Sequence, residues 1–290
     1  MSISHGIRHI LTPMERDRQN SDRKIRVTVV APARALSSEA ADAVTALADE
    51  QYPELHLNFD PQCFLRQGHF AGSDDKRREA FFSAANDPDC DAIWFARGGY
   101  GSIRLLDGLI EQMGPRARRK AYLGYSDTGS LLGALYGAGI GSCLHAPMPS
   151  DIVRQNGQAA VRRALDVIAG RTEAAKQGTA PQAAFNLTVL AALNGTKYMP
   201  DLTGHILHLE DIDEYHYRID RAFAQLATSD WFSRLAGVRL GRFSDIPDND
   251  IDFGMEAHEI ARHWCAVTGV PVLGYSPIGH DAENAVIAFG

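Results

Sequence analysis

YLGYSDTG, residues 122–129, is the stretch of the chain that decides the fold. It begins as an apolar run typical of a buried strand, and a helical pattern over residues 127–136 follows at once. A strand that leads directly into a helix is the repeating unit of an α/β sheet. The passage therefore predicts a tight turn at Ser126, with Gly124 giving it room and the serine hydroxyl at the carboxyl edge of the sheet.

The same alternation continues on both sides of this turn. Strand patterns occupy residues 25–31, 55–59, 91–96, 122–125 and 143–145, and helical patterns occupy residues 41–48, 74–85 and 103–110. Short connections between alternating strands and helices indicate a parallel sheet with helices on both faces. We therefore predict a doubly wound α/β domain over residues 25–149, which carries the serine turn.

The rest of the chain is less regular. Residues 1–24 are polar and charged and predict a flexible lead-in, and residues 150–182 predict a linker that contains one helix at residues 157–168. Strand patterns at residues 204–210, 238–243 and 270–274 alternate with helical patterns at residues 217–228 and 256–266. Residues 183–290 therefore predict a smaller, mixed α/β domain.

Composition narrows the function classes. The chain has 290 residues, 45% of them hydrophobic, and a net charge of −7, so no basic surplus exists for binding nucleic acid or an anionic membrane. No uninterrupted apolar stretch is long enough for a membrane span, and the first residues lack a signal-peptide core, so we expect a cytoplasmic protein. The four cysteines are far apart, which favours buried free thiols over disulfides or a zinc site.

Two turns at predicted strand ends are candidates for chemistry. Ser126 has the strand-turn-helix setting of a nucleophile, although a serine at a helix start is also an ordinary cap, and the following glycine comes one place late for the usual motif. The glycine-rich run from Arg97 to Gly101 lets the backbone approach a ligand closely. It lacks the lysine of a P-loop and the full dinucleotide fingerprint.

A serine nucleophile needs a base and an acid that orients the base. His280 follows a short predicted strand, and Glu210 ends another, but a core histidine and a solvated acidic loop are the alternatives. His258 and His263 resemble a zinc helix, but side chains five residues apart on an α-helix lie about 140° apart around its axis, so we reject them as a metal site. His205 and His208 are rejected too, because residues three apart on a strand face opposite sides.

Taken together and in order, the motifs resemble the LD-carboxypeptidase family of serine peptidases. The matching stretches run through nearly the whole chain: VVAP at 29–32, the RGGYGS region at 93–106, LGYSDT at 123–128, HAPM at 145–148, NLTV at 186–189, NGTKYMP at 194–200, ILHLED at 206–211, YRIDR at 217–221, and GH at 279–280 with Asn284. Departures from the family pattern are Ala146, the pair Ala184–Phe185, and an end at Gly290 soon after the histidine motif.

The resemblance implies a specific site between the two domains. It implies a triad of Ser126, Glu210 and His280, and an oxyanion hole formed by the backbone N–H groups of Gly99 and Asp127. For substrate binding we add two residues from the same region. Arg97 is either a clamp for a substrate carboxylate or part of a structural salt bridge, and Tyr100 lies beside it.

The family's activity implies a reaction without metal or cofactor. It is the release of terminal D-alanine from murein tetrapeptide, at the L,D-peptide bond, by a homodimer. One alternative is a hydrolase of the same family that acts on microcin-type aminoacyl nucleotides. The other is a ligand-binding relative without catalytic activity. The intact triad argues against the second alternative, and the short length of the chain favours murein peptides.

Overall fold

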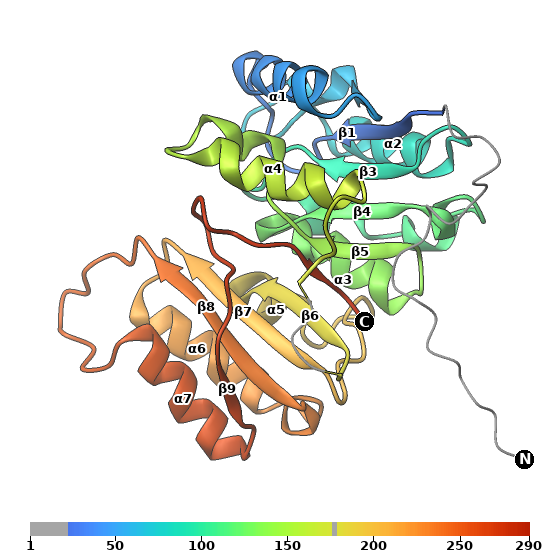
Figure 1. Cartoon of the computed structure of the whole chain (residues 1–290). Helices are drawn as coiled ribbons and strands as arrows, with labels where there is room; N and C mark the ends of the chain where they lie inside the picture. The colour runs from blue at the N-terminus through green and yellow to red at the C-terminus, as the bar shows by residue number, and fades with distance from the viewer. Residues whose placement is uncertain (1–22, 176–178) are drawn as a thin grey trace, which may run out of the picture.

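A computed structural model describes residues 23–175 and 179–290 and shows two sheets, one in each half of the chain (Figure 1). The predicted lead-in lies outside the described residues apart from its last two positions. The first sheet has the strand order β10-β5-β4-β3-β1-β2. Its strands are β1 Ile25–Val30, β2 Leu55–Phe59, β3 Ala92–Phe95, β4 Ala121–Gly124, β5 Ser142–His145 and β10 Ile287–Ala288.

Helices cover both faces of this sheet, which confirms the predicted doubly wound arrangement. Its first five strands run parallel, and only the short β10 is antiparallel, on β5. The buried side chains of α1 and α4 share one core with one sheet face, and those of α2 and α3 share another with the opposite face. The helices are α1 Ser38–Gln51, α2 Asp74–Asn86, α3 Gly129–Gly137 and α4 Gly157–Ile168.

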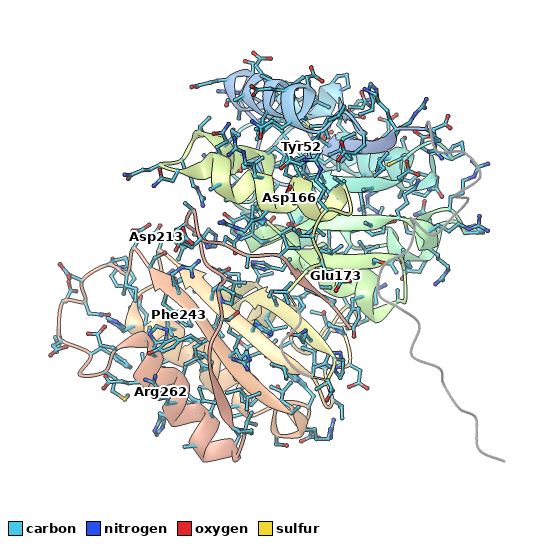
Figure 2. All side chains as sticks on the ribbon, in the orientation of Figure 1. Tyr52, Asp166, Glu173, Asp213, Phe243 and Arg262 are labelled. Carbon is cyan, nitrogen blue, oxygen red and sulfur yellow. The ribbon has the colours of Figure 1, made fainter. Side chains whose placement is uncertain are left out.

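Helix α4 forms where the sequence predicted it, within the proposed linker, and it packs on the first domain. Its apolar face is buried beside α1, as the spacing of Val161, Ala164 and Leu165 requires. The hydroxyl of Tyr52, which caps α1, donates to the Asp166 carboxylate of α4 over 2.9 Å (Figure 2). The chain between the two sheets is therefore folded onto the first of them over this helix.

The second half forms a separate α/β layer. Its sheet has the order β6-β7-β8-β9, and all neighbouring strands are parallel. The strands are β6 Gln182–Asn186, β7 Ile206–Ile212, β8 Gly237–Ser244 and β9 Val272–Tyr275, and the helices are α5 Leu187–Leu193, α6 His216–Ala227 and α7 Ala257–Thr268. This confirms a mixed α/β second half, with a sheet more regular than its sequence suggested.

One predicted helix is wrong. Residues 103–110 form no α-helix; two 3-10 helices, η2 Ser102–Leu105 and η3 Ile110–Gln112, lie there instead. Ser102, at the start of η2, is held by another segment instead, because its hydroxyl bonds to the backbone oxygen of Asp127 and to Ser130 Oγ over 2.5 and 2.7 Å. Gly108 has a φ of 69°, a conformation that glycine adopts readily and that interrupts a helix.

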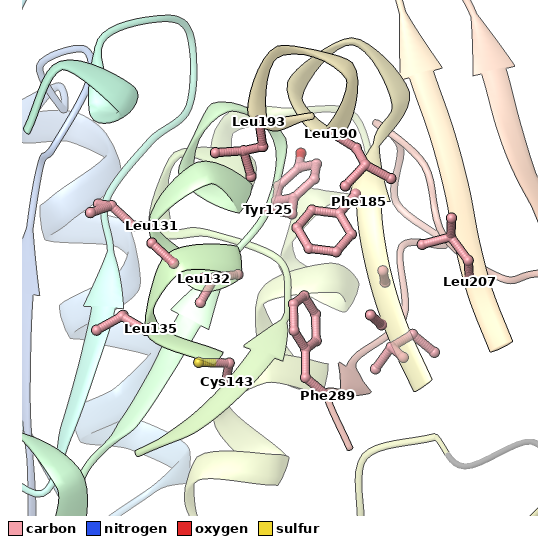
Figure 3. Close-up of a cluster of buried hydrophobic side chains, with 14 of the residues drawn as sticks. Tyr125, Leu131, Leu132, Leu135, Cys143, Phe185, Leu190, Leu193, Leu207 and Phe289 are labelled. Atoms are coloured by element: carbon pink, nitrogen blue, oxygen red, sulfur yellow. The ribbon is translucent and has the colours of Figure 1, made fainter. Parts of the chain in front are cut away.

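An apolar interface joins the two halves (Figure 3). Phe185 of β6 packs on Phe289, with ring centroids 5.2 Å apart, and both belong to the core that includes Leu131 and Leu132 of α3. Gly133 makes the approach of α3 possible, because an added Cβ there would lie 3.0 Å from Leu193 of α5. The departure at Ala184–Phe185 thus lies in this buried interface.

The last residues return to the first sheet. Ile287 and Ala288 pair with β5, and the N–H of Phe289 donates to Cys143 over 2.9 Å. Figure 1 shows this red segment crossing from the second layer to the first. The loop that carries His280 is therefore attached to the second sheet at one end and to the first sheet at the other.

All four cysteines are buried and free, as predicted. Within residues 23–175 and 179–290, no helix combines the length and apolar character needed to cross a membrane.

Candidate active site

Ser126 lies on a strained turn between β4 and α3. Its φ is 58°, a left-handed conformation that costs a non-glycine residue free energy. Its side chain caps neither the 3-10 helix η5 Ser126–Thr128, for which Tyr125 is the N-cap, nor α3, for which Thr128 is. The ordinary helix-cap explanation is therefore wrong, and the turn has the geometry of a nucleophile elbow.

The glycine-rich loop lies directly against this serine. A Cβ added at Gly98 would be 3.0 Å from both Cβ and Oγ of Ser126, so only glycine leaves the hydroxyl free. Gly99 has a φ of 117°, and a Cβ there would overlap the Arg34 side chain. Among the described residues, the backbone N–H groups of Gly99 and Asp127 donate to no acceptor. Two donors thus remain available beside the hydroxyl.

The Asp127 side chain joins the two loops. Its carboxylate accepts hydrogen bonds from the backbone N–H of Gly101 over 3.2 Å and of Ser102 over 2.9 Å. Burial raises the pKa of this carboxyl against the lowering effect of those donors. Asp127 therefore fixes the glycine loop relative to the serine turn, a role that the sequence analysis missed because it considered only the backbone of this residue.

Glu210 and His280 form a buried pair on the other side of the site. The Nδ1 atom of His280 lies 2.7 Å from Glu210 Oε2, and the two side chains are 5% and 0% exposed. Burial disfavours the charged imidazole, but the Glu210 carboxylate outweighs burial and raises the pKa of His280 above its ordinary value. With the acid on Nδ1, the Nε2 atom is left to exchange a proton with a reacting group.

A bulge in β8 makes room for Glu210. The register between β7 and β8 shifts opposite this residue, so β8 has one residue more than β7 there. Gly241 lies at the shift, and an added Cβ would be 2.9 Å from Glu210 Cβ and 2.7 Å from Ile278. This glycine thus lets the acid and the chain before the histidine loop pass each other closely. Sequence reasoning missed it, although a lone glycine within a strand pattern was the available signal.

Asp211 supports the acid from the strand position that follows. Its carboxylate accepts from Asn186 Nδ2 over 2.6 Å, from Thr188 Oγ1 over 2.9 Å and from the Thr188 N–H over 3.1 Å. Burial, followed by the nearby Glu210 charge, raises the pKa of Asp211 to about 6. The network links β7 to the start of α5, so hydrogen bonds join the LED stretch to the NLTV stretch in the folded chain.

A second network orders the histidine loop. Asn284 Oδ1 accepts from the Gly279 N–H over 3.2 Å and lies 3.0 Å from Nε2 of the buried His145. The Tyr125 ring contacts both imidazoles, with its centroid 4.9 Å from that of His280 and 5.4 Å from that of His145. The residue before the candidate nucleophile therefore packs directly on the candidate base.

The structure brings the predicted triad to one place but leaves one link open. Tyr125, which precedes Ser126, packs on the ring of His280, and His280 bonds to Glu210. No hydrogen bond joins Ser126 Oγ to His280 within the part of the chain that the structure describes. Such bonds are often long without substrate and tighten when it binds.

Arg97 is the first residue of the glycine loop and has no carboxylate partner among the described residues. Its Nη1 donates to the Ala35 carbonyl over 3.4 Å. Burial lowers the pKa of Arg97, and the cations of Arg34, Arg154 and Arg66 lower it further. The structural salt bridge that was its alternative role is absent from residues 23–175 and 179–290. Tyr100 is 52% exposed next to it.

The rejected histidine pairs bond elsewhere. His258 Nε2 lies 3.0 Å from the Gly241 carbonyl, while the His263 ring packs on Trp264. His208 bonds to Ser276 inside the second sheet, and His205 bonds to Tyr136. No three metal-binding side chains cluster within the described ranges.

Comparison with known proteins finds carboxypeptidases that are similar over nearly the whole chain. A putative carboxypeptidase of Synechocystis sp. is 33% identical and covers 91% of this chain and 89% of its own. The murein tetrapeptide carboxypeptidase of Pseudomonas aeruginosa is 30% identical over 91% of each chain. The crystal structure of muramoyltetrapeptide carboxypeptidase from Oxalobacter formigenes superposes with a TM-score of 0.74 at 25% identity, covering 91% and 93% of the two chains.

Family patterns match both halves separately. The LD-carboxypeptidase N-terminal domain matches residues 27–146, and the LD-carboxypeptidase C-terminal domain matches residues 182–290. The first match includes the serine turn and the glycine loop, and the second includes Glu210 and His280. The chain therefore belongs to the LD-carboxypeptidase family.

Proposed function

We propose that this protein is a serine carboxypeptidase that cleaves the L,D-peptide bond of murein tetrapeptide and releases terminal D-alanine. The observation that carries the proposal is the buried Glu210–His280 pair beside the strained Ser126 turn. The murein tetrapeptide carboxypeptidase of Pseudomonas aeruginosa, at 30% identity, supports the substrate class. We place the reaction in the cytoplasm, in the recycling of cell-wall peptides.

In the proposed mechanism Ser126 Oγ attacks the carbonyl carbon before the terminal D-alanine. His280 Nε2 takes the hydroxyl proton, and Glu210 holds the imidazole by its other nitrogen. The N–H groups of Gly99 and Asp127 stabilise the oxyanion. The tetrahedral intermediate collapses as His280 returns the proton to the amine of D-alanine, which leaves an ester on Ser126. Water, deprotonated by His280, then hydrolyses that ester.

Arg97 is the proposed site for the substrate's terminal carboxylate. Its guanidinium lies on the loop that supplies an oxyanion donor and has no carboxylate partner within the described residues. A guanidinium binds a carboxylate through two parallel hydrogen bonds, which would select peptides with a free end. The exposed Tyr100 ring is proposed to border the same position.

We also propose a homodimer. Strand β9 is an edge of the second sheet, and three large apolar side chains are exposed around it. Val267, Leu273 and Tyr275 are 63%, 38% and 67% exposed. An uncovered edge strand with apolar side chains favours association. Sedimentation of the purified protein at micromolar concentration tests this, and a monomer would contradict it.

The activity is tested with L-Ala-γ-D-Glu-meso-diaminopimelate-D-Ala and purified protein. We expect release of D-alanine, which is detected by chromatography of the reaction mixture. The peptide amidated at its C-terminus serves as a matched control and should be cleaved poorly, because it lacks the terminal carboxylate. Absence of D-alanine release from the free tetrapeptide would overturn the assignment, and equal cleavage of both peptides would overturn the carboxylate requirement.

A further inference from the structure

The loop that carries His280 is held in place by arginines from distant parts of the chain. Arg163 of α4 donates to the backbone oxygens of Ala282 and Asn284, the latter over 3.0 Å. Arg242 of β8 pairs with the Asp281 carboxylate, with one contact at 2.8 Å. These residues hold the outer part of the loop, from the first and the second half of the chain respectively.

A third arginine, Arg154, reaches the histidine itself. Its Nη1 donates to the backbone oxygen of His280 over 2.9 Å and to the hydroxyl of Tyr125 over 2.9 Å. Arg154 follows the 3-10 helix η6 Pro149–Val153, which lies between β5 and α4. One guanidinium therefore connects the residue before Ser126 to the residue that carries the candidate base.

The hydrogen-bond directions around Tyr125 are fixed. Its hydroxyl has one proton, which it donates to Asp151 Oδ1 over 3.0 Å, so its oxygen is free to accept from Arg154. Burial raises the pKa of Tyr125 well above its ordinary value, so the proton stays. Asp151 is itself held by the Met148 N–H over 2.8 Å and lies 3.3 Å from Arg154. A continuous series of hydrogen bonds therefore runs from the Met148 N–H through Asp151, Tyr125 and Arg154 to the backbone oxygen of His280.

We propose that Arg154 is a positioning residue that fixes the histidine loop to the nucleophile turn across the boundary between the two halves. The inference rests on the proposed function, in which His280 serves Ser126. Because no hydrogen bond joins these two side chains, the position of the loop decides whether the imidazole reaches the hydroxyl. A misplacement of 1 Å in such a site costs roughly a hundredfold in rate.

The charge of Arg154 gives a second, independent readout. The groups that face the His280 ring are Glu210 from β7, Asp151 and Arg154 around η6, His145 from β5, and the Tyr125 ring. Burial and the Arg154 cation lower the pKa of His280, whereas Glu210 and Asp151 raise it. Loss of the cation therefore moves the acid limb of the pH profile upward, and a merely structural residue would not move it.

The experiment measures kcat, KM and the pH profile of D-alanine release for Arg154→Met, Arg154→Gln and Arg154→Lys. We expect Arg154→Met to lose about a hundredfold in kcat with little change in KM, and its acid limb to move to higher pH. Arg154→Gln retains one donor and tests the same loss with a smaller disturbance of folding. Arg154→Lys keeps the cation, so its acid limb should stay at the wild-type pH and part of kcat should return.

Arg171→Met is the matched control. Arg171 also bonds to a carboxylate, Glu54, and to a backbone oxygen, that of Gln51, and its side chain is 41% exposed against 40% for Arg154. It should keep wild-type kcat. If Arg154→Met and Arg154→Gln match this control in kcat and pH profile, or raise KM alone, the inference is overturned. Failure of the proposed function looks different, because wild-type protein would then release no D-alanine.

Discussion

Ser126 and His280 lie on facing sides of one site, and the chain holds them there by different means. Ser126 is placed by backbone: a φ of 58°, a glycine two residues before it and the glycine loop against it. His280 is placed by side chains: the Glu210 carboxylate, the Asn284 amide and the Arg154 guanidinium. The position of Ser126 therefore depends on space that glycines leave open, whereas the position of His280 depends on hydrogen bonds, of which those to Glu210 and Arg154 join residues far apart in the sequence.

The largest effect is expected at the nucleophile. Ser126→Ala removes the attacking oxygen and should lower kcat about a millionfold, as the loss of a member of such a triad does in other serine peptidases. Its melting temperature should equal or exceed that of wild type, because alanine has no cap bond to lose. Retention of D-alanine release by this variant would remove Ser126 from the mechanism.

Glu210→Gln tests the side that depends on hydrogen bonds. The change keeps the shape but removes the charge from the 2.7 Å contact with His280 Nδ1, and kcat should fall about ten-thousandfold. Glu214→Gln is the matched control in the same acidic cluster, since Glu214 pairs with Arg218 at 3.5 Å instead. An equal loss in both variants would mean that Glu210 has no special role.

Gly98→Ala tests the side that depends on empty space. The new methyl group would lie 3.0 Å from Ser126 Oγ, and the displaced hydroxyl should cost about a hundredfold in kcat/KM. Gly129→Ala in α3 is the control, because the nearest atom to its new methyl group would be one of Phe185, at 3.5 Å, an ordinary contact distance. If Gly98→Ala keeps full activity, the loop does not constrain the hydroxyl.

The smallest effect is expected in the dependence of kcat/KM on pH. This dependence distinguishes the groups that raise the pKa of His280 from those that lower it. His280 must be neutral to act as the base, so kcat/KM should rise with pH. The midpoint of this rise should lie above 6.5, the ordinary pKa of histidine, because the pKa of His280 is raised. In Glu210→Gln the carboxylate that raises the pKa is gone while burial and Arg154 remain, so the midpoint should move below the wild-type value. An unchanged midpoint would contradict the coupling of these two residues.

The first half of the fold could be predicted because its information is local. A buried strand, a turn and a helix follow one another within residues 122–137, and the same pattern recurs along residues 25–145. The 3-10 helices in place of the predicted helix at residues 103–110 could not be predicted, because Asp127 and Ser130 hold Ser102 from another segment. Tertiary hydrogen bonds outweighed the helical pattern there.

The site divides in the same way. Ser126 and the glycine loop stood out by their setting at strand ends, while the pairing of Glu210 with His280, 70 residues apart, came only with the family resemblance. Arg154 had no local signal of its role, and the lone glycine at position 241 of a strand pattern was a signal for a bulge but not for the close approach of Glu210. Their roles depend on a register shift and on the docking of a distant loop, which the packing of both halves creates.

The central claim is that residues from the two halves act as one catalytic unit, and a double-mutant cycle tests it most directly. We would measure kcat for D-alanine release by wild type, Ser126→Ala, His280→Ala and the double variant. The account predicts that the double variant is no slower than either single variant, because each already disables the unit. Losses that multiply in the double variant would contradict it and show that Ser126 and His280 act independently.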